Sequence, residues 1–197
     1  MRRPALLAAA ILLAVAPPAH AHLMSTGFGP FYDGLTHLFV TPEDLVLVIG
    51  VGLLAGLAGV APARAAVFSL PAAWLAGSVT GALLGAPATG AAPAAVATVA
   101  VGGLVAADAP LPAWAIAAIA VAIGLLAGGQ NGAELAAAHA STLVAVGAAC
   151  ALFVTLSLLG GQVTAVRASW ARVVLRVGGS WIAAIGLLML GWSLRPA

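Results

Sequence analysis

Six long apolar stretches constrain this chain more than any other feature. They cover about residues 44–60, 65–85, 92–107, 112–128, 133–159 and 172–193, and Gly- or Pro-rich breaks separate them. In lipid, only helices and closed barrels satisfy every backbone polar group. These stretches are continuously apolar over helix lengths, whereas barrel strands alternate apolar and polar residues. The sequence therefore predicts an all-α, polytopic membrane protein with about six transmembrane helices.

The composition supports a membrane location and excludes several other classes. Hydrophobic residues make up 63% of the chain and charged residues only 6%. A soluble domain of this length could not bury so much apolar surface. The net charge of +2 comes from a few arginines, so it gives no reason to expect a nucleic-acid partner. The lipid bilayer is the expected partner.

The N-terminus has the pattern of a secretory signal peptide. Arg2 and Arg3 precede an apolar core at 5–16, and Ala19-His20-Ala21 is a small-residue cleavage motif. We expect a signal peptide at 1–21 and a single helical transmembrane domain at 22–197. An uncleaved first anchor is the alternative, although a core of about a dozen residues is short for a full span.

The distribution of arginines predicts the orientation. A cleaved signal places the mature N-terminus outside the cell, so that the first, third and fifth loops face the cytoplasm. Those loops carry Arg64, Asp108, Arg167 and Arg172, and Arg195 is the outward-facing arginine at the tail. The positive-inside rule agrees with this arrangement. We therefore expect a multi-pass protein of the bacterial inner membrane.

A polar cluster stands where the chain first enters the membrane. His37 precedes Glu43 and Asp44 by six and seven residues, and seven residues along a continuous helix return to nearly the same face. Imidazole and carboxylate groups suit divalent transition metals. The structural alternative is that Thr41 caps a helix beginning at Pro42, with the carboxylates in its first turn.

A second polar segment is predicted at the outer end of the fifth stretch. Asn131 and Glu134 share a helix face if one helix includes both. A carboxylate at membrane depth needs a partner. His139 lies deeper in that stretch and is the weaker metal-ligand candidate, because a lone His in an apolar helix is more often a packing residue. Both polar segments are predicted at the same membrane face.

His22 is a further candidate metal ligand, and Cys150 is a candidate packing residue. Cleavage after Ala21 would leave His22 with a free amino group and an imidazole, which together can chelate a metal ion. Cys150 is predicted to be a small buried packing residue. The spacings Gly52-x3-Gly56 and Gly77-x3-Gly81 permit close helix packing. No hydrolase, Walker or Cys-x-x-Cys motif is present, and we expect no enzyme activity.

Two motifs resemble the HupE/UreJ family of hydrogenase and urease accessory membrane proteins, which are regarded as nickel or cobalt permeases. The first is Gly34-Leu35-Thr36-His37, with Glu43 and Asp44 where the family has Asp and His. The second is the segment 131–134, with Asn131 in place of a family His. The similar flanking segments are 27–29 and 45–53.

The resemblance implies a permease-like protein for a divalent ion of the nickel or cobalt type, without a tightly bound cofactor. The implied metal-binding residues are His37, Glu43, Asp44, Asn131 and Glu134, with His22 as a first capture ligand. Oxygen ligands in place of two family histidines shift the preference towards harder ions. The rival hypothesis is a non-transporting accessory protein whose partners mature a metalloenzyme. An intramembrane hydrolase using His139 and a serine is a second rival.

Overall fold

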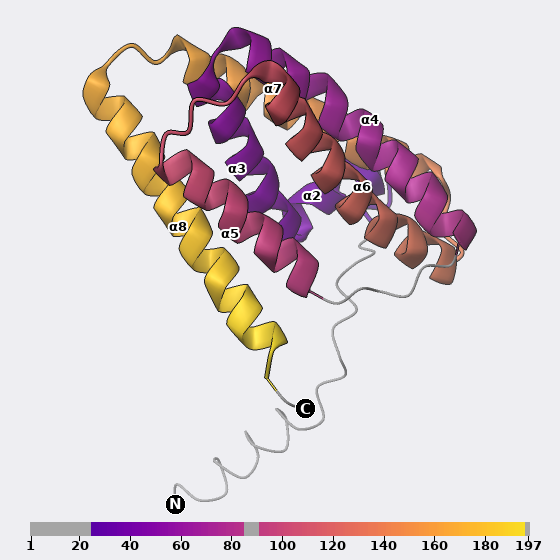
Figure 1. Cartoon of the computed structure of the whole chain (residues 1–197). Helices are drawn as coiled ribbons and strands as arrows, with labels where there is room; N and C mark the ends of the chain where they lie inside the picture. The colour runs from indigo at the N-terminus through magenta and orange to yellow at the C-terminus, as the bar shows by residue number, and fades with distance from the viewer. Residues whose placement is uncertain (1–24, 85–90, 196–197) are drawn as a thin grey trace, which may run out of the picture.

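The computed structural model describes residues 25–84 and 91–195, and these fold into seven helices (Figure 1). The predicted signal peptide at 1–21 and the candidate ligand His22 lie outside the described residues. The helices are α2 (Pro30–Val40), α3 (Pro42–Ala58), α4 (Val60–Leu84), α5 (Ala92–Ala106), α6 (Ala113–Ala137), α7 (Leu143–Ala165) and α8 (Ser169–Ser193). The predicted all-helical fold is confirmed, and α2 is a helix that the apolar pattern did not indicate.

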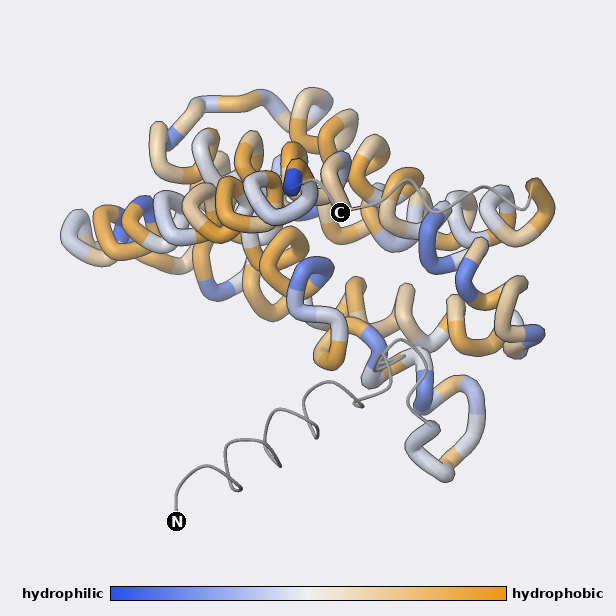
Figure 2. Tube along the Cα trace, turned by 90° about the horizontal axis from the view of Figure 1, so that it is seen from below, coloured by the Kyte–Doolittle hydropathy of each residue, from blue (hydrophilic) through white to orange (hydrophobic). Residues whose placement is uncertain are grey.

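The membrane-crossing elements are fewer than predicted. Among the described residues, α4, α6, α7 and α8 are long and apolar enough to cross a membrane, and α2 with α3 forms a fifth span if this bent pair counts as one. The predicted third span is the shorter apolar helix α5, of 15 residues. Viewed by hydropathy, the trace is apolar along most of the helix lengths, with isolated hydrophilic residues (Figure 2).

Helices α4 and α6 run parallel and pack closely through small residues. A Cβ atom added to Gly128 would meet the backbone of Trp74, and one added to Gly132 would meet the backbone of Ser78. The predicted break at 128–132 is therefore wrong. These residues are small because two helix backbones approach each other there, and α6 continues through them to Ala137.

The chain leaves α6 at His139 instead, so the predicted single span at 133–159 is also wrong. His139 has a φ of 51°, in the left-handed region where a helix cannot continue, and α7 begins only at Leu143. His139 is exposed in this connection and does not lie deep in a helix. Cys150, on α7, is exposed as well, whereas a buried position was predicted.

The predicted helix start at Pro42 is confirmed, but it follows another helix directly. Pro42 has no N–H to continue the hydrogen bonds of α2, and a residue before proline is driven out of the α region. Thr41 accordingly adopts φ −111° and ψ 86°, and α3 leaves α2 at 77°. Gly34 allows α2 to lie directly against α7, because an added Cβ would meet the backbone at Val144.

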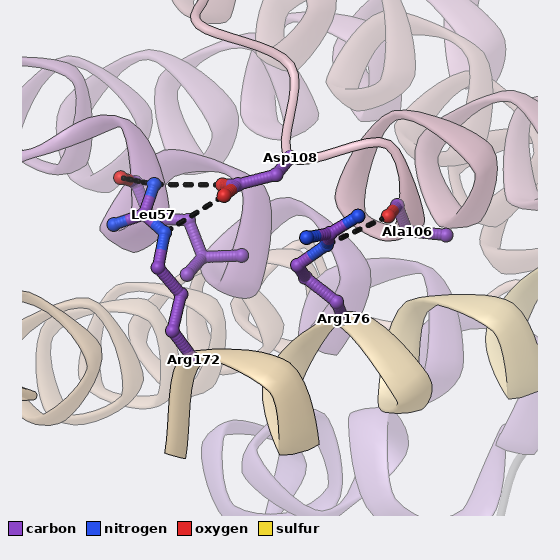
Figure 3. A network of polar contacts seen from close by, with 5 residues as sticks. All are labelled: Leu57, Ala106, Asp108, Arg172 and Arg176. Atoms are coloured by element: carbon purple, nitrogen blue, oxygen red, sulfur yellow. Dashed lines mark hydrogen bonds and ion pairs between the residues drawn. The ribbon is translucent and has the colours of Figure 1, made fainter. Parts of the chain in front are cut away.

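Helices α5 and α8 form an antiparallel pair on the other side of α3. Gly102 and Gly186 make the close approach possible, since a Cβ on either would meet the opposite helix. At the end of the bundle away from Thr41, Arg172 donates to the Asp108 carboxylate at 2.7 and 2.8 Å and to the Leu57 carbonyl oxygen at 3.3 Å (Figure 3). Arg176 donates to the carbonyl oxygen of Ala106 at 3.0 Å.

Arg172 and Arg176 bind the ends of two neighbouring helices. In the structure they bind carbonyl oxygens at the C-terminal ends of α3 and α5, where a helix lacks intrahelical donors and carries partial negative charge. The hydrogen bonds from Arg172 hold the pKa of Asp108 below its ordinary value of 3.8. This network joins three helices at one end of the molecule.

Candidate metal-binding site

A cavity of about 430 Å³ opens at the opposite end of the bundle, between α2, α3, α5, α6 and α8. Its walls combine the two polar segments predicted from the sequence with small and apolar side chains. The lining residues are His37, Thr41, Pro42, Glu43, Asp44, Val46, Ala91, Ala94, Ala127, Gln130, Asn131, Glu134, Ile185 and Met189. The two polar segments therefore meet in one cavity, although 94 residues separate His37 from Asn131.

A direct contact joins the two segments. The Nδ2 atom of Asn131 lies 3.1 Å from Nε2 of His37, and both side chains are buried, at 4% and 5% exposure. The Oδ1 atom of Asn131 accepts a hydrogen bond from Ser78 at 3.5 Å. The polar chain thus continues from α2 through α6 into α4.

Asp44 approaches the same imidazole nitrogen that Asn131 contacts. Its Oδ2 atom is 4.0 Å from Nε2 of His37, although the helix between the two residues is interrupted. The expected cap from Thr41 is absent, because its hydroxyl donates to the His37 carbonyl oxygen at 2.9 Å. Glu43 and Asp44 do occupy the first turn of α3, as predicted, and they also line the cavity.

The carboxylate of Glu134 belongs to the same site but comes from the C-terminal part of α6. Asn131 precedes it by one turn, and both side chains line the cavity, as a shared helix face requires. The sequence predicts Glu134 at the start of a span, whereas it lies in the last turn of α6. This does not move it to the other membrane face, because α6 ends where the predicted span began.

Three further residues at or near the cavity were not predicted from the sequence, namely Ser78, Gln130 and Met189. Ser78 is a single hydroxyl in an apolar stretch, and only its position beside Gly77 in the small-residue spacing of α4 could have indicated a contact. Gln130 precedes Asn131 and falls in the predicted break between the fourth and fifth stretches. Met189, on α8, brings a thioether to the cavity wall, and no pattern around it distinguishes it from a packing residue.

The remaining candidates do not join this cluster. His139 does not line the cavity and is exposed beyond the end of α6. Within residues 25–84 and 91–195, no group of three or more His, Cys, Asp or Glu side chains is arranged to hold a metal ion. The cavity instead offers one imidazole, three carboxylates and two side-chain amides, which come from α2, α3 and α6.

The side chains that line the cavity suit more than one kind of divalent ion. Oxygen groups suit harder divalent ions, and imidazole nitrogen and thioether sulfur suit borderline and softer ones. Side chains on α2, α3 and α6 reach the same space, so an ion there would lie between helices and not on one helix surface. Sites of this kind occur between the helices of bundles.

Comparison with sequence families matches residues 10–189 to the HupE / UreJ protein family. No curated protein and no solved structure gives a significant match. The family match covers most of the chain. It includes both polar segments, the helices from α2 to α7 and most of α8. With its apolar helices, the match indicates a multi-pass membrane protein with an accessory or transport-related role for nickel or cobalt. The chain belongs to the HupE/UreJ family.

Proposed function

We propose that this protein admits a divalent transition-metal ion, of the nickel or cobalt type, into the membrane through the cavity that holds His37. The observation that supports the proposal most is the contact between His37 and Asn131, because it joins both family-type motifs at one buried point. Carboxylates from α3 and α6 face the same cavity and would supply the negative charge that a divalent cation needs.

The cavity is proposed to face the outside of the cell. Arg64 lies near the start of α4, and α4 runs parallel to α6, whose last turn carries Glu134 at the cavity. Arg64 therefore lies at the end away from the cavity, together with Arg172 at the start of α8. Arginines favour the cytoplasmic side. We propose a bacterial inner-membrane location with the mature N-terminus outside.

Inward movement of a cation is favourable across a membrane that is negative inside. The membrane potential contributes about 2.3 kcal/mol per charge per 100 mV, so a divalent ion gains about twice that. We propose passage without a tightly bound cofactor, without catalysis and without nucleic acid. His22, if exposed by signal cleavage, would be a first ligand ahead of the cavity.

The test is uptake of nickel, cobalt, zinc, manganese and copper ions into cells or vesicles that carry the protein. His37→Ala and Glu134→Gln are each expected to abolish uptake while the protein remains folded in the membrane. His139→Ala is the matched control, because it removes a histidine that lies outside the cavity.

Two results would contradict the proposal in different ways. If no ion enters faster with the wild-type protein than without it, the accessory hypothesis replaces transport. Uptake that survives both cavity substitutions would instead mean that the ion follows another route. Equal loss in His139→Ala would show that the assay does not report on the cavity.

A further inference from the structure

Ser78 begins a buried chain of polar side chains that ends at the candidate metal-binding site. Its Oγ atom lies 3.5 Å from Oδ1 of Asn131, and Nδ2 of the same amide lies 3.1 Å from Nε2 of His37. Ser78 is 3% exposed, so little water competes for its hydroxyl. Buried polar groups that lose a partner are costly, and a linear chain of this kind couples each orientation to the next.

The backbone that carries Ser78 is fixed against α6. Gly132, the residue after Asn131, packs so closely that an added Cβ would meet the carbonyl oxygen of Ser78. One turn earlier, Gly128 packs in the same way against Trp74. Neither helix can slide without a clash between backbones, so the Ser78 hydroxyl keeps its place beside the Asn131 amide.

The amide now covers the nitrogen that a metal ion would use. A neutral imidazole accepts a hydrogen bond only at its unprotonated nitrogen, so donation by Nδ2 of Asn131 places the His37 proton on Nδ1 and occupies the Nε2 lone pair. An ion cannot bind Nε2 while an N–H group points at the same lone pair. Either Asn131 moves away or its amide turns over.

Turning over needs no additional space. A half-turn about the last side-chain bond exchanges Oδ1 and Nδ2, which are nearly equal in size. Oδ1 would then face the cavity beside Nε2 and bind the same ion, and Nδ2 would point towards Ser78. A serine hydroxyl either donates or accepts, so Ser78 can serve both orientations by rotating its own proton.

We propose that Ser78 is a positioning residue for the metal-binding site: it holds the Asn131 amide over His37 when the site is empty and accepts from the turned amide when an ion is bound. This inference rests on the proposed function, and it adds a residue of α4 that neither family-type motif contains. Asn131 acts directly on the ion, whereas Ser78 acts only through Asn131.

Removal of the Ser78 hydroxyl should affect the two states unequally. In the empty state, Ser78→Ala leaves a carbonyl oxygen with fewer partners, which proteins tolerate better than a buried N–H without an acceptor. In the ion-bound state, the turned amide would bury its N–H group against the alanine. We expect Ser78→Ala to weaken Co²⁺ binding about tenfold.

The same substitution should have little effect where Asn131 is already alanine. Asn131→Ala removes the amide, so Ser78 has nothing to position, and adding Ser78→Ala should change Co²⁺ binding less than about twofold. Ser69→Ala is the matched control on α4. Among the described residues, the buried Ser69 hydroxyl oxygen has no hydrogen-bond partner, and its loss should leave binding unchanged.

The experiment uses the full chain, purified and placed in lipid nanodiscs, with ¹⁵N-labelled histidine. The His37 signals are identified by their loss in His37→Gln, and Co²⁺ is titrated while their paramagnetic shift is followed. In the metal-free protein above the imidazole titration range, Nε2 of His37 should carry no proton. If Ser78→Ala does not fold, Ser78→Cys replaces it, since a thiol keeps the volume but accepts weakly.

Three outcomes would overturn the inference. One is a protonated Nε2 in the neutral, metal-free protein, and this does not depend on transport. The second is an equal loss of Co²⁺ binding from Ser78→Ala with and without Asn131, which would mark a packing role. The third is Co²⁺ binding that does not involve His37. Failure of the proposed function alone would appear differently, as the expected binding pattern in nanodiscs without uptake into vesicles.

Discussion

Replacing Gly132 by alanine is expected to separate α4 from α6 and to destabilise the protein. The added Cβ would meet the carbonyl oxygen, carbonyl carbon and Cα of Ser78, all of them backbone atoms that cannot move aside as a flexible side chain would. Gly128 fixes the same two helices one turn away, so a local shift would disturb that contact too.

The structure places the cost in the upper part of the range for overpacking. Forcing extra atoms into a packed interior costs about 1–3 kcal/mol, and a clash with helix backbone leaves few ways to relax. We therefore expect about 2–3 kcal/mol for Gly132→Ala. The substitution should also disturb the hydrogen bond from Ser78 to Asn131, because that bond depends on the same helix separation.

Gly129→Ala is a control on the same helix. A Cβ there would lie 3.9 Å from the nearest atom, the carbonyl oxygen of Gly77, which is an ordinary van der Waals contact. Alanine also favours a helix over glycine, by up to about 1 kcal/mol. Gly129→Ala should therefore be neutral or slightly stabilising.

The assay is unfolding of the purified protein in mixed micelles by a denaturing detergent, followed by tryptophan fluorescence. Trp74, on α4, is 2% exposed and its backbone contacts α6 at Gly128, so its fluorescence should change when the two helices separate. The two variants should differ by about 3 kcal/mol in free energy of unfolding. If Gly132→Ala unfolds at the same detergent fraction as Gly129→Ala, close backbone packing does not fix this helix pair.

Two further predictions concern the other end of the bundle and the N-terminus. Asp108→Asn should destabilise the protein by about 0.5–1 kcal/mol near neutral pH, since half of the Arg172 side chain is exposed and water screens the pair. Arg172 lowers the pKa of Asp108, so this difference in free energy of unfolding should persist above pH 3.8 and vanish as the pH falls through the lowered pKa. A difference that stays constant in acid would contradict this prediction. Signal cleavage after Ala21 should make N-terminal sequencing of the mature protein begin at His22, and an intact initiator methionine would contradict the predicted cleavage.

The helical fold was predictable because its signal is compositional. Long runs without charge admit only helices in lipid, and each of the six predicted runs overlaps a helix of the structure. Composition does not show whether a glycine ends a helix or allows two helices to pack closely. Gly132 and Gly59 look alike in the sequence, yet Gly132 continues a helix through a close contact, while Gly59 ends α3 with a φ of 120°.

Most residues of the candidate site were predictable from the sequence, but the contacts between them were not. His37, Asp44, Asn131 and Glu134 stood out because polar groups are rare in this chain, and the structure gathers them in one cavity. The missing partner was Ser78. A serine among apolar residues carries no periodic signal, and its role depends on the parallel packing of two helices that are distant in sequence.

The interruption at Pro42 is what brings His37 and Asp44 together. On a continuous helix, seven residues rise about 10.5 Å along the axis, so a shared face alone would leave the two side chains two turns apart. The 77° bend brings the imidazole nitrogen and the carboxylate oxygen to 4.0 Å.

Pro42→Ala restores an N–H group that can extend α2 past the bend. We expect it to raise the apparent KM for metal uptake severalfold in a protein that still folds. Pro30→Ala is the control, because the first residue of α2 needs no N–H bond within the helix. Equal KM values for the two variants would show that the bend is held by the packing of α2 on α7 and not by the proline.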